Sequence, residues 1–501
     1  MGARTLMVQG TASNVGKSVL VAALCRILRQ DGYRVVPFKA QNMALNAAVT
    51  IDGGEIGRSQ ATQAAAAGIE PTVDMNPILL KPEAGMRSQV IVRGRVWRTL
   101  PWREYYRHRD ELLGVVAESL AGLRARADVV VIEGAGSPAE PNLKAGDIVN
   151  MRVAALADAP VLLAGDIDRG GVFAALLGTL ELLDPDERAR VRGLVINKFR
   201  GDATLLAPAL DFIAGRTGVP VLGVVPHLER VGLPEEDSVA LEVPARRAGD
   251  GADLDIAVVH LSRISNFDDF DPLAAEPGVG VRFVAEAADL GSPDLLILPG
   301  TKSTIADLAV LRERGLDRAI VRLARGGTPL LGICGGFQML GETIADPHGV
   351  ESDERAVAGL GLLPLRTVFA HEKTTVRAAG VVAGDRGLLA GAAGLPFRGY
   401  EIHLGRTDGA LPAALRVTER RGGAADAPDG ALSADGWIGG VYIHGLFDSP
   451  SLRAALLRNL AARRGLPARA WGAPRADPFD RLADHVRASL DLPRLYRIIG
   501  L

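Results

Sequence analysis

One cysteine stands at the junction between an expected strand and an expected helix. Residues 329–333 are apolar, and Cys334 is followed by Gly335, Gly336 and a further apolar run. A thiol in such a turn lies at a helix N-terminus, where unpaired backbone N–H groups favour the thiolate. Glycine lets the backbone approach the sulfur, and the N–H of Gly335 is a candidate oxyanion donor. The pattern favours a nucleophile for acyl transfer, with a buried core cysteine as the alternative.

A nucleophilic thiol needs a base, and His444 ends the expected strand that begins at residue 439. It is the natural general base for Cys334. The turn at residues 332–336 resembles the nucleophile turn of class I glutamine amidotransferases, which implies hydrolysis of glutamine with release of ammonia. That family carries a carboxylate two residues after the histidine, where this chain has Leu446. Either another group orients His444, or the histidine acts with the cysteine alone.

A glycine-rich loop lies near the N-terminus. Residues 5–9 predict a short strand, residues 10–18 read Gly-Thr-Ala-Ser-Asn-Val-Gly-Lys-Ser, and a helical pattern follows until Asp31. Backbone N–H groups and the helix N-terminus can hold phosphates, a lysine can neutralise them, and a serine can reach Mg²⁺. The expected nucleotide-binding residues of this loop are Gly10, Thr11, Gly16, Lys17 and Ser18.

The loop has five residues between its first two glycines, where the common form has four. This variant resembles the loop of dethiobiotin synthetase and its relatives, which activate a carboxylate as an acyl phosphate. Partitioning ATPases share that fold but carry a signature lysine where this chain has Ala12. The loop therefore favours an ATP-dependent synthetase.

Polar residues end other expected strands of this half. Residues 129–132 are continuous Val and Ile, which is typical of a buried parallel strand, and Glu133 ends it. The resemblance to dethiobiotin synthetase implies that Glu133 and Ser18 bind Mg²⁺ and that Asn197 binds adenine. Asp52 is a second metal candidate, with a simple turn at Gly53 as the alternative.

Two polar stretches, residues 35–46 and 70–82, lie where a substrate would meet the phosphates. From their residue types alone, Lys39 and Lys81 could be surface charges. The strings at residues 38–46 and 73–77 resemble the family of cobyric acid synthases, glutamine-dependent amidases of cobalamin biosynthesis. The candidate substrate-binding residues are Lys39, Gln41, Asn42, Asn46, Asp166, Asp168 and Arg169.

The resemblance extends over nearly all of the chain. It implies amidation of the b, d, e and g carboxylates of adenosylcobyrinic acid a,c-diamide to give adenosylcobyric acid, with ATP and glutamine consumed for each amide. One alternative is cobyrinic acid a,c-diamide synthase, which has a different string after the first lysine. The other is a non-catalytic nucleotide switch protein with an inactive amidotransferase-like domain.

The second half holds further candidates. Residues 294–304 predict a strand and a glycine turn, and the amidotransferase resemblance makes Gly300 and Thr301 candidates for the second oxyanion N–H. His403 either lines the site or is structural. The acids in residues 265–272 lack the glycine and terminal glutamate of a calcium loop, so we expect a solvated loop that faces the other domain.

Length and the order of expected elements predict the fold class. A chain of 501 residues is too long for a single hydrophobic core, and expected strands alternate with expected helices. We expect an α/β protein: a P-loop doubly wound parallel sheet of the dethiobiotin synthetase type, then a class I amidotransferase-like α/β domain. The expected boundaries are 1–242 for the ATP-dependent synthetase domain, 243–253 for a linker, 254–450 for the amidotransferase domain and 451–501 for a C-terminal helical extension.

A net charge of −2 gives no case for nucleic acid, and no apolar run is long enough for membrane insertion. Two cysteines in different expected domains, Cys25 and Cys334, imply no disulfide and fit a cytoplasmic protein. The expected cofactors are ATP and Mg²⁺, and the expected partners are L-glutamine and a corrinoid. The composition is compatible with an oligomer.

Overall fold

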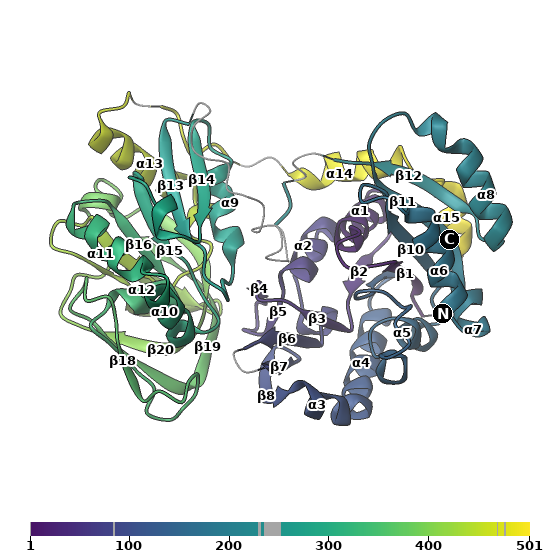
Figure 1. The fold of residues 1–501 in the computed structure, drawn as a ribbon, viewed down its shortest axis with the longest axis horizontal. Coiled ribbons are helices and arrows are strands. Elements are labelled where there is room, and N and C mark those ends of the chain that lie inside the picture. The colour runs from purple at the N-terminus through teal and green to yellow at the C-terminus, as the bar shows by residue number, and fades with distance from the viewer. Residues whose placement is uncertain (1, 84–85, 229–231, 235–251, 468, 475–476) are drawn as a thin grey trace.

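The structure, a computed structural model, forms two lobes that lie side by side in the view of Figure 1. The first lobe contains β1 to β12, and the second contains β13 to β24. The residues described are 2–83, 86–228, 232–234, 252–467, 469–474 and 477–501. Of the expected linker at 243–253, residues 243–251 lie outside the described residues.

A six-stranded parallel sheet forms the centre of the first lobe, in the order β12-β11-β10-β1-β9-β2. Its strands are β1 (Arg4–Gly10), β2 (Val35–Phe38), β9 (Val129–Glu133), β10 (Val161–Asp166), β11 (Val191–Phe199) and β12 (Val221–Pro226). Because β1 is central and later strands lie on both sides of it, the sheet is doubly wound, as predicted. Since parallel strands end at one edge, β1, β9, β10 and β11 carry their terminal polar residues to the same place.

Helices cover both faces of this sheet, and buried Val, Leu and Ile side chains of the strands pack against them. The helices are α1 (Lys17–Gln30), α2 (Arg58–Ala67), α3 (Trp102–Tyr105), α4 (Arg109–Arg124), α5 (Met151–Ala157), α6 (Val172–Leu182), α7 (Pro185–Arg190) and α8 (Ala207–Thr217). Helix α1 ends at Gln30 with Asp31 as its C-cap, in agreement with the predicted end of the helix at Asp31.

Short strands extend the first lobe towards the second (Figure 1). They form a four-stranded sheet of β3 (Gln41–Met43), β6 (Ile78–Pro82), β7 (Arg87–Val92) and β8 (Arg95–Pro101), and a hairpin of β4 (Ala47–Val49) and β5 (Glu55–Gly57). Strand β5 leads directly into α2. Ala47 and Leu79 of this extension share a small apolar cluster with Tyr400 and Ile402 of the second lobe.

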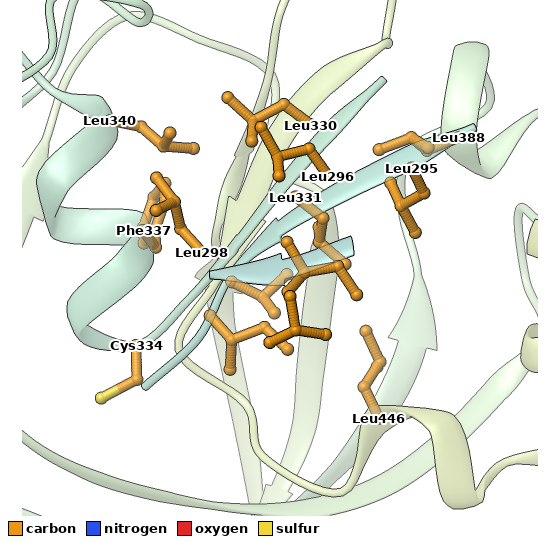
Figure 2. Close-up of a cluster of buried hydrophobic side chains, with 14 of the residues drawn as sticks. Leu295, Leu296, Leu298, Leu330, Leu331, Cys334, Phe337, Leu340, Leu388 and Leu446 are labelled. Atoms are coloured by element: carbon orange, nitrogen blue, oxygen red, sulfur yellow. The ribbon is translucent and has the colours of Figure 1, made fainter. Parts of the chain in front are cut away.

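The second lobe has its own six-stranded sheet, in the order β14-β13-β15-β16-β24-β23. Its strands are β13 (Leu254–Val259), β14 (Val279–Val284), β15 (Leu295–Leu298), β16 (Leu330–Ile333), β23 (Ala431–Leu432) and β24 (Ile438–Val441). All neighbouring pairs are parallel except β23 with β24. Figure 2 shows the buried leucines of β15 and β16, with Cys334 at the edge of the same cluster.

A second, mostly antiparallel sheet lies beside it, dominated by the long pair β19 (Arg366–Val382) and β20 (Pro396–Asp408). The other strands are β17 (Thr343–Ala345), β18 (Ala356–Ala358), β21 (Leu415–Arg420) and β22 (Gly423–Asp429). The helices of the lobe are α9 (Asp271–Ala274), α10 (Thr304–Glu313), α11 (Leu316–Arg325), α12 (Gly335–Leu340) and α13 (Pro450–Arg464).

The C-terminal segment divides between the lobes. Helix α13 packs in the core of the second lobe, whereas α14 (Pro478–Arg487) and α15 (Leu492–Ile499) pack against the first (Figure 1). Arg26 of α1 pairs with Asp477 and Asp480, both at 2.7 Å. Among the described residues, no helix is long and apolar enough to cross a membrane.

Candidate active sites

Cys334 occupies a strained turn between β16 and α12. Its φ is +51° and its ψ is −110°, a backbone region that residues with side chains rarely adopt. The turn needs glycine on both sides of the cysteine. A Cβ on Gly336 would lie 2.0 Å from the Leu298 carbonyl oxygen, and one on Gly332 would lie 2.7 Å from the backbone of Phe337. The sequence pattern of a strand, a sharp turn and a helix is therefore confirmed.

The imidazole of His444 is held by Asp269. Its Nδ1 lies 2.7 Å from Oδ2 of Asp269, whose Oδ1 accepts from the N–H of Gly445 at 2.8 Å. His444 is 1% exposed, and burial alone would lower its pKa. The Asp269 carboxylate and the hydrogen bond with Cys334 outweigh burial and raise the pKa of His444 to about 10. Asp269 therefore orients His444, in place of the carboxylate that the amidotransferase family carries at the position of Leu446.

The expectation of a solvated loop at residues 265–272 is wrong. Asp269 and Asn266 are buried, because the neighbouring residues Phe267 and Phe270 pack in the core of the second lobe. The loop does face the first lobe, since Asn266 accepts from the N–H of Ala47 at 2.9 Å. The aromatic residues between the acids are the sequence signal that could have indicated burial.

The strand expected to end at His444 is shorter than predicted. Strand β24 ends at Val441, and His444 instead pairs with Tyr400 of β20 through its backbone. The His444 N–H donates to the Tyr400 carbonyl at 2.9 Å, and the reverse bond measures 3.2 Å. This bridge brings the imidazole back towards the sulfur.

The three oxyanion candidates lie together at this site. A Cβ on Gly300 would lie 2.8 Å from Cε1 of His444, and one on Gly335 would lie 3.2 Å from the backbone nitrogen of Thr301. Gly300 is thus close to the imidazole, and Thr301 is close to Gly335, the residue that follows Cys334.

The cavity beside Cys334 lies at the boundary between the lobes. Gln338, Lys373 and His403 of the second lobe line it together with Lys81 from β6 of the first lobe. His403 satisfies both expectations: it lines the cavity, and its ring nitrogens bond Gly405 O at 2.9 Å and a Glu401 carboxylate oxygen at 3.1 Å. Lys81 is 2% exposed and is therefore not a surface charge.

The glycine-rich loop forms a second cluster at the edge of the first lobe's sheet. Gly16 has φ +95°, and Lys17 donates to the carbonyl oxygens of Ala12 and Gly136, both at 2.9 Å. Ser18 Oγ donates to Glu133 at 2.8 Å. The positive φ explains why this position requires glycine.

Glu133 is fully buried and fully bonded. Lys39 pairs with it at 2.8 Å, Ser18 donates to the same oxygen, and Gln63 of α2 donates to the other. Burial alone would raise the pKa of Glu133, but these cationic and hydrogen-bonding partners lower it. The carboxylate is therefore ionised where a nucleotide's phosphates would lie.

The other residues predicted at this edge are also there. Asn197 donates to the Val15 carbonyl of the loop at 2.8 Å. Asp166 accepts from Lys198 at 2.9 Å. The exposed residues Asp168 and Arg169 follow at the end of β10, with Asp168 bonded to Arg200 at 2.9 Å.

The remaining candidates lie between the two clusters or beyond them. Gln41 accepts from the Tyr105 hydroxyl, and Asn42 donates to Gln60 of α2 at 2.9 Å. The buried Asn46 accepts from the N–H of Phe267 in the second lobe at 3.4 Å. Thr11 donates its N–H to the Ala164 carbonyl at 2.9 Å.

The residues expected to hold Mg²⁺ fit in part. Glu133 and Ser18 present oxygen atoms side by side at the phosphate cradle, the hard donors that Mg²⁺ takes alongside water and phosphate. Asp52 is exposed at the tip of the β4–β5 hairpin and accepts a hydrogen bond from the Thr50 hydroxyl. It therefore takes part in a turn, which was the alternative to metal binding. Among the described residues, no group of three or more His, Cys, Asp or Glu could hold a metal by itself.

Comparison with known proteins assigns each lobe. Residues 6–239 match a CobQ/CobB/MinD/ParA nucleotide binding domain, and residues 255–452 match a CobB/CobQ-like glutamine amidotransferase domain. Together with the two clusters, these matches define the class: a nucleotide-binding, glutamine-hydrolysing carbon–nitrogen ligase.

Curated relatives give the family. The chain is 58% identical to the cobyric acid synthase of Sorangium cellulosum (strain So ce56), over 100% of this chain and 99% of the relative. It is 55% identical to the cobyric acid synthase of Dehalococcoides mccartyi (strain CBDB1), over 99% of both chains. The chain therefore belongs to the cobyric acid synthase family, which confirms the resemblance seen at residues 38–46 and 73–77.

Proposed function

We propose that this chain amidates the b, d, e and g carboxylates of adenosylcobyrinic acid a,c-diamide, giving adenosylcobyric acid. Each amide uses ammonia from glutamine and the activating power of ATP. The observation that supports the proposal best is the buried Cys334–His444–Asp269 arrangement, in a lobe attached to a glycine-rich phosphate cradle. The similarity to cobyric acid synthases supports the choice of substrate.

In the first reaction, the sulfur of Cys334 attacks the glutamine amide carbon while the proton of the thiol resides on His444. The N–H groups of Thr301 and Gly335 are the proposed donors to the oxyanion, and the proximity of these two residues supports this role. Asp269 stabilises the imidazolium, which then protonates the departing ammonia. Water attacks the thioester that remains, with His444 as base, and glutamate leaves.

In the second reaction, a substrate carboxylate takes the γ-phosphoryl group of ATP, and ammonia displaces phosphate from the acyl phosphate. Lys17 and the backbone of residues 10–18 hold the phosphates, and Asn197 lies beside this loop to meet the base. Glu133 and Ser18 would hold Mg²⁺, which when bound neutralises phosphate charge. Lys39 and Asp166 lie at the same edge as candidates to orient the carboxylate.

The test is Cys334→Ala, with product formation measured from glutamine and, separately, from ammonium salts. We expect glutamine-dependent synthesis to be lost and ammonia-dependent synthesis to remain, because the phosphate cradle is untouched. Cys25→Ala is the matched control, since Cys25 is a fully buried core thiol of α1. If ammonia does not restore synthesis in folded Cys334→Ala protein, the two-site scheme is wrong.

Product mass tests the substrate. Addition of four amides to the a,c-diamide supports the proposal, and addition of two amides to cobyrinic acid would instead indicate the a,c-diamide synthase.

A further inference from the structure

Arg58 stands at an unfavourable place in its own lobe. It is the first residue of α2, and the first turn contains no acidic side chain. A cation at a helix N-terminus opposes the helix dipole, and this side chain is only 17% exposed. Contacts outside the helix must therefore balance its charge.

Those contacts lie in the second lobe. The guanidinium pairs with Asp268 at 3.0 Å and donates to the hydroxyl of Tyr400. It also lies over the Tyr400 ring, 5.2 Å from the centroid. One arginine of the nucleotide-binding lobe thus contacts both the loop that carries Asp269 and the strand that carries Tyr400.

Both of these contacts adjoin the imidazole. Asp268 directly precedes Asp269, the partner of His444. The Tyr400 ring stacks on the His444 ring at 5.3 Å with an angle of 17°, and the two residues form the backbone bridge described above. Arg58 is not among the residues that line the cavity beside Cys334, so the contacts that link it to the site are those with these neighbours.

We propose that Arg58 is a positioning residue for glutamine hydrolysis, supplied to the His444–Asp269 pair by the nucleotide-binding lobe. By pairing with Asp268, it offsets the negative charge of the carboxylate next to Asp269 and holds the loop that carries Asp269 in place. By holding Tyr400, it fixes the ring against which His444 rests. This inference rests on the proposed roles of Cys334 and His444.

The test compares steady-state glutamine hydrolysis and ammonia-dependent synthesis in the full chain. For Arg58→Gln we expect kcat for glutamine hydrolysis to fall about 10- to 100-fold, because misplacement of a general base by an ångström costs that much. KM for glutamine and ammonia-dependent synthesis should stay near wild type. Arg58→Lys keeps the charge without the planar fork, so its loss should be smaller, about threefold to tenfold.

Arg377→Gln is the matched control. Arg377 also crosses between the lobes, pairing with Glu70 at 2.7 Å and donating to the Val49 carbonyl at 2.7 Å. Its backbone lies opposite Tyr400 in the β19–β20 ladder, but the side-chain contacts described for it involve neither Asp268 nor the Tyr400 hydroxyl. Its kcat should remain within about twofold of wild type, as for a partly exposed ion pair.

Three outcomes decide the matter. Unchanged kcat in Arg58→Gln, or an equal fall in Arg377→Gln, would overturn the inference. If Arg58→Gln does not fold, Tyr400→Phe must show the same selective loss of kcat in weaker form. An unchanged kcat in Tyr400→Phe would then overturn the inference. Cys334→Ala separates this failure from that of the proposed function, because retained glutamine hydrolysis in that variant would refute the function itself.

Discussion

At the scale of single residues, the charge of His444 depends on Asp269. The folded pKa of about 10 means that the His444 imidazole is protonated at neutral pH, where it lies beside the Asp269 carboxylate. The stabilisation from this pair is fully present below the ordinary histidine pKa of 6.5, and it is lost as the pH rises through 10. The same proton is the one that the departing ammonia needs.

Asp269→Asn should therefore change both rate and pH dependence. The amide keeps a hydrogen-bonding group beside Nδ1 but removes the charge that raises the histidine pKa. We expect kcat for glutamine hydrolysis to fall about 10²- to 10⁴-fold and the alkaline limb of its pH profile to move to lower pH. Glutamine hydrolysis measured from pH 6 to pH 10.5 checks this, and an unmoved alkaline limb would show that Asp269 does not hold the imidazole's charge.

The thiol and the histidine could be predicted from their own neighbours, whereas Asp269 could not. Glycines beside Cys334 reveal the strained turn directly in the sequence. Asp269 precedes His444 by 175 positions, and nothing near either residue records the contact. The usual position for the carboxylate holds Leu446, which is buried and packs in the core. The contacts of Arg58 could not be predicted for the same reason, because its partners Asp268 and Tyr400 belong to the other lobe.

At the scale of elements, the turn before α12 depends on close packing against β15. Gly336→Ala would place a methyl carbon 2.0 Å from the Leu298 carbonyl oxygen, so α12 must move away from the sheet. We expect the free energy of unfolding to fall by about 1–3 kcal/mol and glutamine hydrolysis to fall with it. Denaturant unfolding and a glutaminase assay measure the two effects.

Gly215→Ala provides the comparison. This glycine lies inside α8, is exposed, and has no atom within 4 Å of a Cβ placed on it. Alanine there should stabilise the helix by about 0.5–1 kcal/mol. If both substitutions have the same effect, close packing is not what makes Gly336 necessary.

Most elements of the two parallel sheets could be predicted, because continuous apolar strands alternate with amphipathic helices. The short strands β3 to β8 could not, since their apolar residues divide between two places. Ile78, Leu80 and Val90 pack in the core of the first lobe, whereas Leu79 and Ile91 join the small cluster with the second lobe. The length of β24 was overestimated because its apolar run continues beyond the last ladder pair, into Tyr442 and Ile443.

At the scale of the whole molecule, a buried carboxylate joins the lobes. Glu55 of β5 pairs with Lys81 of its own lobe and with Lys373 of β19, the latter at 2.5 Å. Burial alone would raise the pKa of Glu55, but the two lysines lower it from 4.5 to about 2. Because the folded pKa is depressed, the resulting stability is present above pH 4.5 and is lost as the pH falls towards 2.

Glu55→Gln should remove this contribution. The shift corresponds to about 3 kcal/mol, so the variant should unfold more easily by that order at pH 7. The difference from wild type should narrow as the pH falls below 4.5, because Glu55 of the unfolded wild-type chain then takes up a proton while the folded form stays ionised until about pH 2. Denaturant unfolding at pH 7, 5 and 4 measures the trend, and a difference independent of pH would contradict it.

Helix α2 contacts both clusters of functional side chains. Arg58 at its first turn bonds Tyr400, and Gln63, about 7.5 Å further along the axis, donates to Glu133 and to the backbone of Ser18. A nucleotide that rearranges Glu133 and Ser18 would displace the same rigid segment that supports the glutaminase. Thermodynamic reciprocity then requires that glutamine alter nucleotide affinity by the same factor by which nucleotide alters glutamine affinity.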